Sequence, residues 1–178
     1  MHNIVADHQG ACYGLSEERY FHLADRNSFV LHNARLNNGI IHSISALSLP
    51  GATTPYNMLN SQQEKENVWE EVRNSSRAFR QLPSRHNAFY CFSSREDAER
   101  AKAEWFKEED KILIDVKITE NAIFHVADSK YLNYVKPEWH VAAQNYWAGM
   151  ATEEPFFEVV VHGAVYFPEW QSFNPIIG

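Results

Sequence analysis

The chain has 178 residues, of which 44% are hydrophobic, 13% aromatic and 22% charged, and its formal net charge at pH 7 is -7. This composition is typical of a globular protein and excludes a disordered or fibrous chain. A negative charge of this size argues against a broad electrostatic grip on nucleic acid. The length predicts a single domain over residues 1–178 with a sizeable buried core.

Two features of the sequence indicate the cellular compartment of the protein. Its cysteines, Cys12 and Cys91, lie far apart and form no CxxC pair, so we expect neither a disulfide framework nor a zinc site. The first ten residues lack the charged start and apolar core of a signal peptide, and no segment approaches the roughly 18 apolar residues of a membrane helix. We therefore expect no membrane partner. The predicted location is the cytoplasm, or the cytosol of a target cell after delivery.

The first half of the chain is expected to hold two helices. Residues 1–16 are polar and predict an irregular lead-in, and residues 45–60 predict a long loop. Apolar positions at helical spacing, including Trp69 and Val72, predict a helix over residues 62–80 with Ser61 as its N-cap. The other elements predicted here are a strand over 19–24, a short helix capped by Asn27 or Ser28 that ends near 37–39, and an apolar stretch over 40–44.

The second half alternates strands and helices without a regular βαβ repeat. It predicts strands over 89–92, 111–118, 122–126 and 156–166, a short element over 131–135, and helices over 95–106 and 138–148. Ser94 is the expected cap of the first of these helices, with Ala98, Ala101 and Trp105 facing inward, and Gly163 the expected site of a bulge. The fold class is α+β with a mainly antiparallel, strongly curved sheet and flanking helices.

Glu158 is the most unusual residue of the predicted core. It lies near the start of a run of Val, Phe and Tyr that predicts a buried strand. A carboxylate buried there without a partner costs several kcal/mol. Glu158 therefore belongs to a functional site, pairs with an arginine, or reaches water at the strand end.

The sequence lacks the residue patterns that mark several other kinds of functional site. The nine histidines show no HxxxH or HExxH spacing, so we expect no metal. The glycines of Rossmann, P-loop and hydrolase-elbow motifs are absent. Pairing of Cys91 with His22 or His140 stays open, but a buried, inert thiol is the expected outcome in an aromatic strand.

Arginines and aromatic residues support two further expectations. Arg73, Arg77 and Arg80 share one face of the predicted helix 62–80, where a solvated face is usual. Arg80 and Arg85, which flank Pro83, suit recognition of a pyrophosphate. Core packing is the expected role of the three large aromatic residues of the last helix, Trp139, Tyr146 and Trp147.

Five stretches, in this order, resemble the ADP-ribosyltransferase-like fold, and in particular a bacterial and phage family within it. They are Tyr20-Phe21-His22-Leu23; Glu71-Val72-Arg73 with Leu82-Pro83-Ser84-Arg85; Phe89-Tyr90-Cys91-Phe92 with Glu96-Asp97-Ala98; Ala143 with Tyr146-Trp147-Ala148-Gly149; and Glu158-Val159-Val160-Val161-His162-Gly163-Ala164-Val165. The resemblance implies a split, curved sheet that cradles NAD⁺ in a cleft.

The resemblance also implies roles for single residues. His22 would hydrogen-bond the nicotinamide ribose, with Tyr20 beside it, although Arg19 or Arg26 is an alternative ligand. Tyr90 or Ser93 would brace the ribose or stack on the nicotinamide. Glu158 would orient the ribose 2′-hydroxyl and stabilise the positive centre as nicotinamide leaves. Phe156 stands where arginine-specific relatives carry an acid, which argues against an arginine acceptor.

The implied function is mono-ADP-ribosylation of a macromolecule with NAD⁺ as substrate, in a bacterial or phage toxin or effector. The acidic net charge favours a protein acceptor over DNA or RNA. An antitoxin or immunity partner would fit such an activity. The alternatives are a nucleic-acid-modifying toxin of a toxin–antitoxin or phage-defence system, an NAD⁺ glycohydrolase, and a binding module that has lost catalysis.

Overall fold

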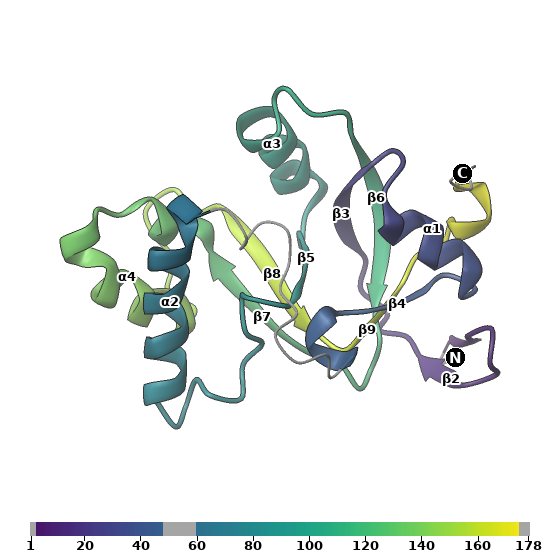
Figure 1. Cartoon of the computed structure of the whole chain (residues 1–178), viewed down its shortest axis with the longest axis horizontal. Helices are drawn as coiled ribbons and strands as arrows, with labels where there is room; N and C mark the ends of the chain where they lie inside the picture. The colour runs from purple at the N-terminus through teal and green to yellow at the C-terminus, as the bar shows by residue number, and fades with distance from the viewer. Residues whose placement is uncertain (1–2, 48–59, 175–178) are drawn as a thin grey trace. The chain divides into compact units, whose positions relative to one another are not determined.

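The computed structural model describes residues 3–47 and 60–174, which form a mixed α+β protein with antiparallel sheets and flanking helices, as predicted (Figure 1). The chain divides into two compact units, each assembled from separate segments. The first unit holds Met1–His42, Cys91–Ala122 and Gly163–Gly178, and the second holds Ser43–Tyr90 and Ile123–His162. No helix of the described residues is long and apolar enough to span a bilayer.

The first unit is built on a four-stranded antiparallel sheet. Its strand order is β3 (Tyr20–Asp25), β6 (Lys111–Ile118), β9 (Ala164–Tyr166) and β4 (Ile40–His42). The unit also contains a hairpin of β1 (Ile4–Ala6) and β2 (Cys12–Gly14), the helices α1 (Phe29–Leu36) and α3 (Arg95–Trp105), and a 3₁₀ turn, Trp170–Ser172.

The second unit packs two helices onto a three-stranded sheet. Its strand order is β5 (Phe89–Cys91), β8 (Phe157–His162) and β7 (Ile123–Asp128), and the helices are α2 (Asn60–Ser75) and α4 (Trp139–Trp147). Its described residues also form 3₁₀ turns at Ile44–Leu47, Ser129–Asn133 and Lys136–Glu138. Trp69 and Val72 of α2, Tyr146 and Trp147 of α4, and Val160 of β8 belong to one buried cluster.

Local sequence signals explain several of these elements. The hydroxyls of Ser28 and Ser94 each accept a hydrogen bond from the backbone three residues on, which caps α1 and α3 as predicted. Strand β6 has the predicted bounds. Tyr146 and Trp147 are buried, and this confirms the core role expected for these two residues.

Four predictions about single elements were wrong. The N-terminal lead-in contains the β1–β2 hairpin. Trp105 is 41% exposed instead of facing inward. Gly163, with φ +126°, ends β8, and the chain continues as β9 in a different sheet instead of one strand with a bulge. This φ favours glycine.

The fourth error concerns the long helix. Helix α2 ends at Ser75, so Arg77 and Arg80 lie beyond it and share no helix face with Arg73, and Ser61 lies inside the helix. The Ser75 hydroxyl donates to the carbonyl of Val72, and the Arg73 guanidinium donates to the carbonyls of Arg80 and Leu82. Ser75 thus satisfies a carbonyl of the last helical turn, and Arg73 binds the segment that follows the helix. Most of the predicted loop over 45–60 lies outside the described residues.

Candidate functional site

Glu158 is the second residue of β8, and its side chain faces the helices of the second unit. The register pairs it with Ala127 of β7 and places it on the same face of the sheet as Val160, which is part of the buried cluster. The residue is only 6% exposed. Glu158, the charged residue in the apolar run, is therefore a carboxylate at the edge of the core of the second unit.

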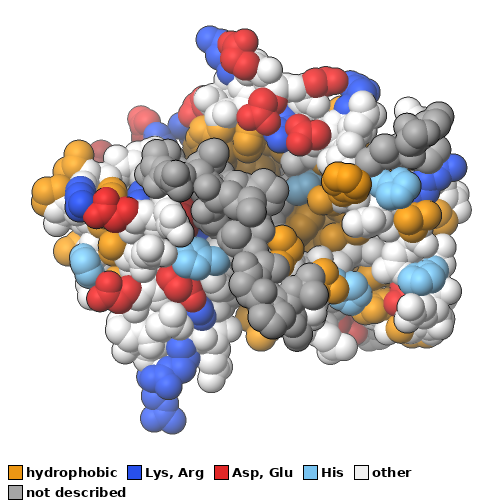
Figure 2. Space-filling model, in the orientation of Figure 1, with side chains coloured by type: hydrophobic (Ala, Val, Ile, Leu, Met, Phe, Trp, Pro, Cys, Tyr) orange, Lys and Arg blue, Asp and Glu red, His pale blue; other side chains and the backbone are white. Residues whose placement is uncertain are grey.

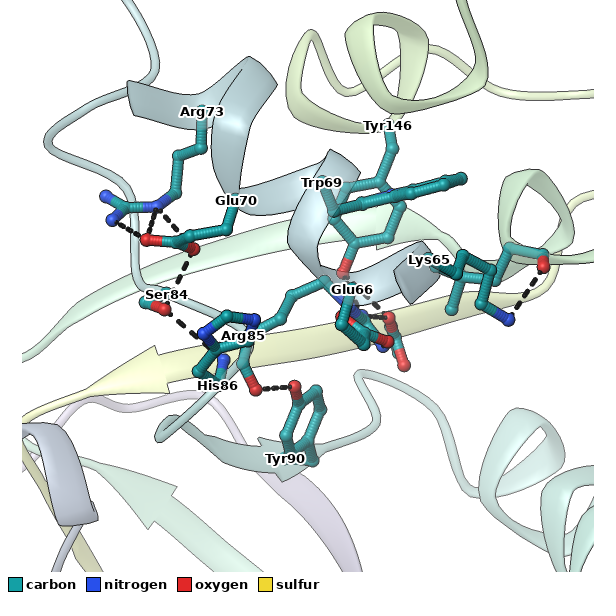
Figure 3. Close-up of polar contacts among 12 residues, drawn as sticks. Lys65, Glu66, Trp69, Glu70, Arg73, Ser84, Arg85, His86, Tyr90 and Tyr146 are labelled. Atoms are coloured by element: carbon teal, nitrogen blue, oxygen red, sulfur yellow. Dashed lines mark hydrogen bonds and ion pairs between the residues drawn. The ribbon is translucent and has the colours of Figure 1, made fainter. Parts of the chain in front are cut away.

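Arg85 supplies the charge that opposes Glu158. Its guanidinium is 2% exposed and binds Glu66 of α2 in a bidentate manner, Nε to Oε2 at 2.8 Å and Nη2 to Oε1 at 3.1 Å (Figure 3). The third nitrogen, Nη1, donates to Glu158 Oε1 and, at 2.6 Å, to the Tyr146 hydroxyl. A planar guanidinium suits this arrangement because its donors form a fixed fork. Arg85 thus joins α2, α4 and β8.

Tyr146 completes the cluster as a neutral donor. Its hydroxyl donates to Glu158 Oε1 at 2.7 Å. Burial raises the pKa of this phenol well above its ordinary value, and the neighbouring Glu158 adds to the effect against an opposing contribution from Arg85. The phenol therefore keeps its proton. It can accept from the guanidinium and donate to the carboxylate at once.

The two oxygens of Glu158 have different surroundings. Oε1 takes both hydrogen bonds, from Arg85 and from Tyr146. Oε2 has no hydrogen-bond partner among the residues that the structure describes, and it is not among their fully enclosed polar atoms. One oxygen of the carboxylate is fixed by the protein, and the other keeps its capacity to accept a hydrogen bond.

The charges of the cluster stabilise one another. Burial favours loss of the Arg85 proton, but Glu158 and Glu66 outweigh it and hold the arginine pKa well above its ordinary value. Lys65, one residue before Glu66, donates from Nζ to the carbonyl of Leu132 at 3.1 Å. Burial lowers the pKa of Lys65, although the two carboxylates oppose that shift. Two acids therefore face one buried guanidinium, with a half-buried lysine nearby.

A second polar network anchors the loop that carries Arg85. Glu70 accepts from Arg73 Nε at 3.1 Å and from the Ser84 hydroxyl at 2.9 Å. Burial acts to raise the pKa of Glu70, but the hydrogen bonds from Arg73 and Ser84 hold it below its ordinary value. The Tyr90 hydroxyl donates to the backbone carbonyl of Arg85. Ser84 and Tyr90 thus fix the chain on both sides of the arginine (Figure 3).

The cluster has the chemistry of a carboxylate site. Among residues 3–47 and 60–174, no group of three or more His, Cys, Asp or Glu side chains is arranged to hold a metal ion. Cys91 is fully buried, and burial raises the pKa of its thiol, so it is poorly suited as a nucleophile. An ionised carboxylate with one free oxygen can bind a hydroxyl and stabilise a nearby positive charge.

Residues 16–170 match a protein family described as "Protein of unknown function (DUF2441)". The chain belongs to this family. The match includes both acids of the cluster, Arg85 and Tyr146, and omits only the two ends of the chain. No curated protein matches the sequence.

Three of the residues predicted for the site lie together in this member of the DUF2441 family. They are Glu158, Arg85 and Tyr90, all in the second unit. Tyr20, His22, Arg26 and Ser93 belong to the first unit. There the His22 ring lies 5.9 Å from that of Phe167, and the Tyr20 hydroxyl donates to Glu18 at 2.9 Å.

The other first-unit residues predicted for the site are at its surface. Arg26 pairs with Asp110 at 3.0 Å and Arg19 with Asp115 at 3.2 Å, and all but Asp115 are largely exposed. Ser93 is exposed.

Sequence reasoning missed Glu66 and favoured core packing over ligand stacking for Tyr146. The signal for Glu66 was present: it precedes Trp69 by three residues and therefore lies on the apolar stripe of α2. A charge on such a stripe needs a partner, just as Glu158 does. Tyr146 carried no such signal, because a tyrosine at a core position is ordinary.

Proposed function

We propose that the chain is an NAD⁺-dependent mono-ADP-ribosyltransferase with the ADP-ribosyltransferase-like split, curved sheet, in which Glu158 is the catalytic carboxylate. The observation that carries the proposal is the one-sided binding of Glu158. Arg85 and Tyr146 hold Oε1, while Oε2 has no partner among the described residues. This is what a carboxylate needs to bind the 2′-hydroxyl of a ribose and to face its anomeric carbon.

The reaction breaks the bond between the ribose C1 and the nicotinamide nitrogen, and the bonding electrons leave with nicotinamide. Positive charge develops on the ribose ring as this bond lengthens. An ionised Glu158, fixed in place before the reaction, stabilises that charge better than water, which must reorient. A nucleophile of the acceptor then bonds to C1 and loses its proton.

Arg85 has a supporting role in this proposal. Its buried guanidinium binds Glu66 and Glu158, so its contacts favour the positioning of Glu158 over direct recognition of a pyrophosphate. Tyr90, which donates to the Arg85 carbonyl, fixes the same loop. His22, Tyr20, Arg26 and Ser93 are proposed to bind NAD⁺ on the resemblance alone.

A protein side chain is the proposed acceptor. The net charge is -7. On the face shown in Figure 2, the described Lys and Arg side chains are interspersed with Asp and Glu over most of the surface, apart from one basic group at the lower left. A nucleic-acid substrate favours a continuous basic stripe. A toxin or effector acting in a cytosol, with a neutralising partner, is the biological role proposed.

The test is nicotinamide release by the purified protein with NAD⁺. The wild type should release nicotinamide, and Glu158→Gln should release it about 100-fold to 1,000-fold more slowly, as for the loss of other preorganised electrostatic groups. Glu138→Gln, an exposed acid in the same unit, is the matched control and should behave as the wild type. Equal release by wild type and Glu158→Gln would reject the proposal.

The acceptor is tested separately with labelled NAD⁺ in a cell lysate. Label that is released by protease and resists nuclease supports a protein acceptor. Label released by nuclease identifies DNA or RNA instead. Nicotinamide release without macromolecular label identifies a glycohydrolase.

A further inference from the structure

A cleft in the second unit is separate from the Glu158 cluster in its lining. Its volume is about 750 Å³, and it is lined by the 3₁₀ turn Ser129–Asn133, by Asn145 of α4 and by residues 151–154. None of Glu66, Arg85, Tyr146 and Glu158 lines it. It is shallow and open to solvent, so it contacts one side of a ligand.

Tyr131 gives this cleft a buried polar group. The residue is 6% exposed, and its ring is part of the buried cluster under α2 and α4. Its hydroxyl has no hydrogen-bond partner among the described residues. The fully enclosed unpaired polar atoms of those residues are Trp69 Nε1 and Asn87 Oδ1. The Tyr131 hydroxyl is not one of them, so it meets solvent in the cleft that the residue lines.

Other groups around Tyr131 also have hydrogen-bonding capacity left. The side-chain amides of Asn133 and Asn145 line the cleft and make no hydrogen bond to the described part of the chain. Tyr134 lines it too, is 39% exposed, and has its ring 5.5 Å from that of Tyr131. Asn133 is exposed and Asn145 is half-buried, so of these three residues only Tyr131 is buried, where a polar group normally finds a partner. A cleft that combines this hydroxyl with two amides and an aromatic surface is suited to a ligand.

The hydrogen-bonding side chains that line the cleft indicate which class of ligand it can bind. Phenols and carboxamides both donate and accept hydrogen bonds. An anion needs donors only and a cation needs acceptors only. Lys130, Glu153 and Glu154 at this cleft carry charges of both signs, so they do not single out an ion of either sign. A ring with several neutral hydroxyls uses donors and acceptors together, and its C–H face packs on an aromatic ring.

We infer that this cleft binds a neutral, polyhydroxylated ring, that is, a sugar, through the Tyr131 hydroxyl, the Asn133 and Asn145 amides and the Tyr134 ring. The sugar is either a free pyranoside or the ribose of a nucleoside. The site is independent of NAD⁺ cleavage, because it shares no residue with the Glu158 cluster.

The experiment is saturation-transfer NMR with the full chain and four probes: the methyl pyranosides of glucose, galactose and mannose, and adenosine. At least one probe should show transfer with millimolar affinity. Transfer to a pyranoside identifies a saccharide site, and transfer to adenosine alone identifies a nucleoside site. Absence of transfer to all four overturns the inference.

Two variants test the residues. Tyr131→Phe and Asn145→Ala should each weaken binding of the responding probe about fivefold, the effect of one neutral hydrogen bond. Tyr131→Phe removes a hydroxyl without an internal partner, so the fold and its thermal midpoint should be retained. Glu158→Gln should bind the probe as the wild type does, and Tyr131→Phe should release nicotinamide as the wild type does. Undiminished binding by the Tyr131→Phe, Asn145→Ala double variant contradicts the assignment.

Discussion

Arginines pair with acids in both units, but in different environments. In the second unit Arg85 is 2% exposed and is shared by Glu66 and Glu158. In the first unit Arg26 and Asp110 are 60% and 73% exposed at the side chain. An exposed pair is screened by water and contributes little, whereas buried charges depend on each other because each has lost its water. The buried group is therefore the one that matters most for stability and for the proposed chemistry.

Removing the buried arginine should have the largest effect. Arg85→Met leaves Glu66 and Glu158 buried without their cation, and we expect a loss of about 3–5 kcal/mol in the free energy of unfolding. Urea denaturation followed by circular dichroism measures it. The control is Arg26→Met in the first unit, which should leave the urea midpoint unchanged. Equal shifts in the two variants would show that burial does not distinguish the pairs.

A milder substitution, at Glu66, should distinguish the role of this acid from that of Glu158. Glu66→Gln keeps the shape of the side chain but replaces one carboxylate oxygen with an NH₂ group that faces an N–H donor of Arg85. This change should lower the free energy of unfolding by about 1–3 kcal/mol. Nicotinamide release should fall about tenfold, because Arg85 is then less firmly oriented toward Glu158. Glu64→Gln, an exposed acid two residues earlier that pairs with Lys136, should change stability by less than about 0.5 kcal/mol. A Glu66→Gln variant as active and stable as Glu64→Gln would contradict the positioning role.

A third prediction concerns the pH dependence of stability, which is a smaller change than the loss of the buried arginine. Asp128 is fully buried and accepts from the backbone of Phe156, Thr152 and Lys130. Burial acts to raise its pKa, but these hydrogen bonds hold it below the ordinary value. Its stabilising effect is therefore complete above the unfolded pKa of about 4 and is lost as pH falls through the lower folded pKa.

Asp128→Asn tests this assignment. The variant should be less stable than the wild type by about 1–3 kcal/mol at pH 7, and the difference should narrow below about pH 4. Urea denaturation over a pH series measures it. Asp110→Asn, at an exposed acid, is the control and should show a weaker dependence. A constant difference between wild type and Asp128→Asn would rule out a titrating Asp128.

Periodicity and capping signals predicted most of the fold. Strand β6 and the starts of α1 and α3 follow from local patterns that tertiary contacts do not override. The end of α2 could not be predicted, because it depends on Arg73 reaching carbonyls seven and nine residues later. The break at Gly163 depends on which sheet each half of a continuous apolar run joins, and sequence alone does not contain that choice.

The candidate site, like the fold, could be predicted only in part from the sequence. Glu158 was identifiable because a charge in an apolar strand violates a local rule, and such violations mark sites of function or pairing. Its pairing with Glu66, Arg85 and Tyr146 was not, because these residues lie 92, 73 and 12 positions away in the chain and meet only in the fold. Arg85 was singled out for its chemistry, and its buried position then indicated a different task.

The central claim is that Glu158 stabilises the reacting ribose and does not merely complete an ion-pair cluster. It is tested most directly by measuring NAD⁺ affinity calorimetrically and single-turnover nicotinamide release in the wild type and Glu158→Gln. A stabiliser of the transition state predicts NAD⁺ affinity within a few fold of wild type and release slower by about 100-fold or more. Release at the wild-type rate from a folded Glu158→Gln protein would contradict it.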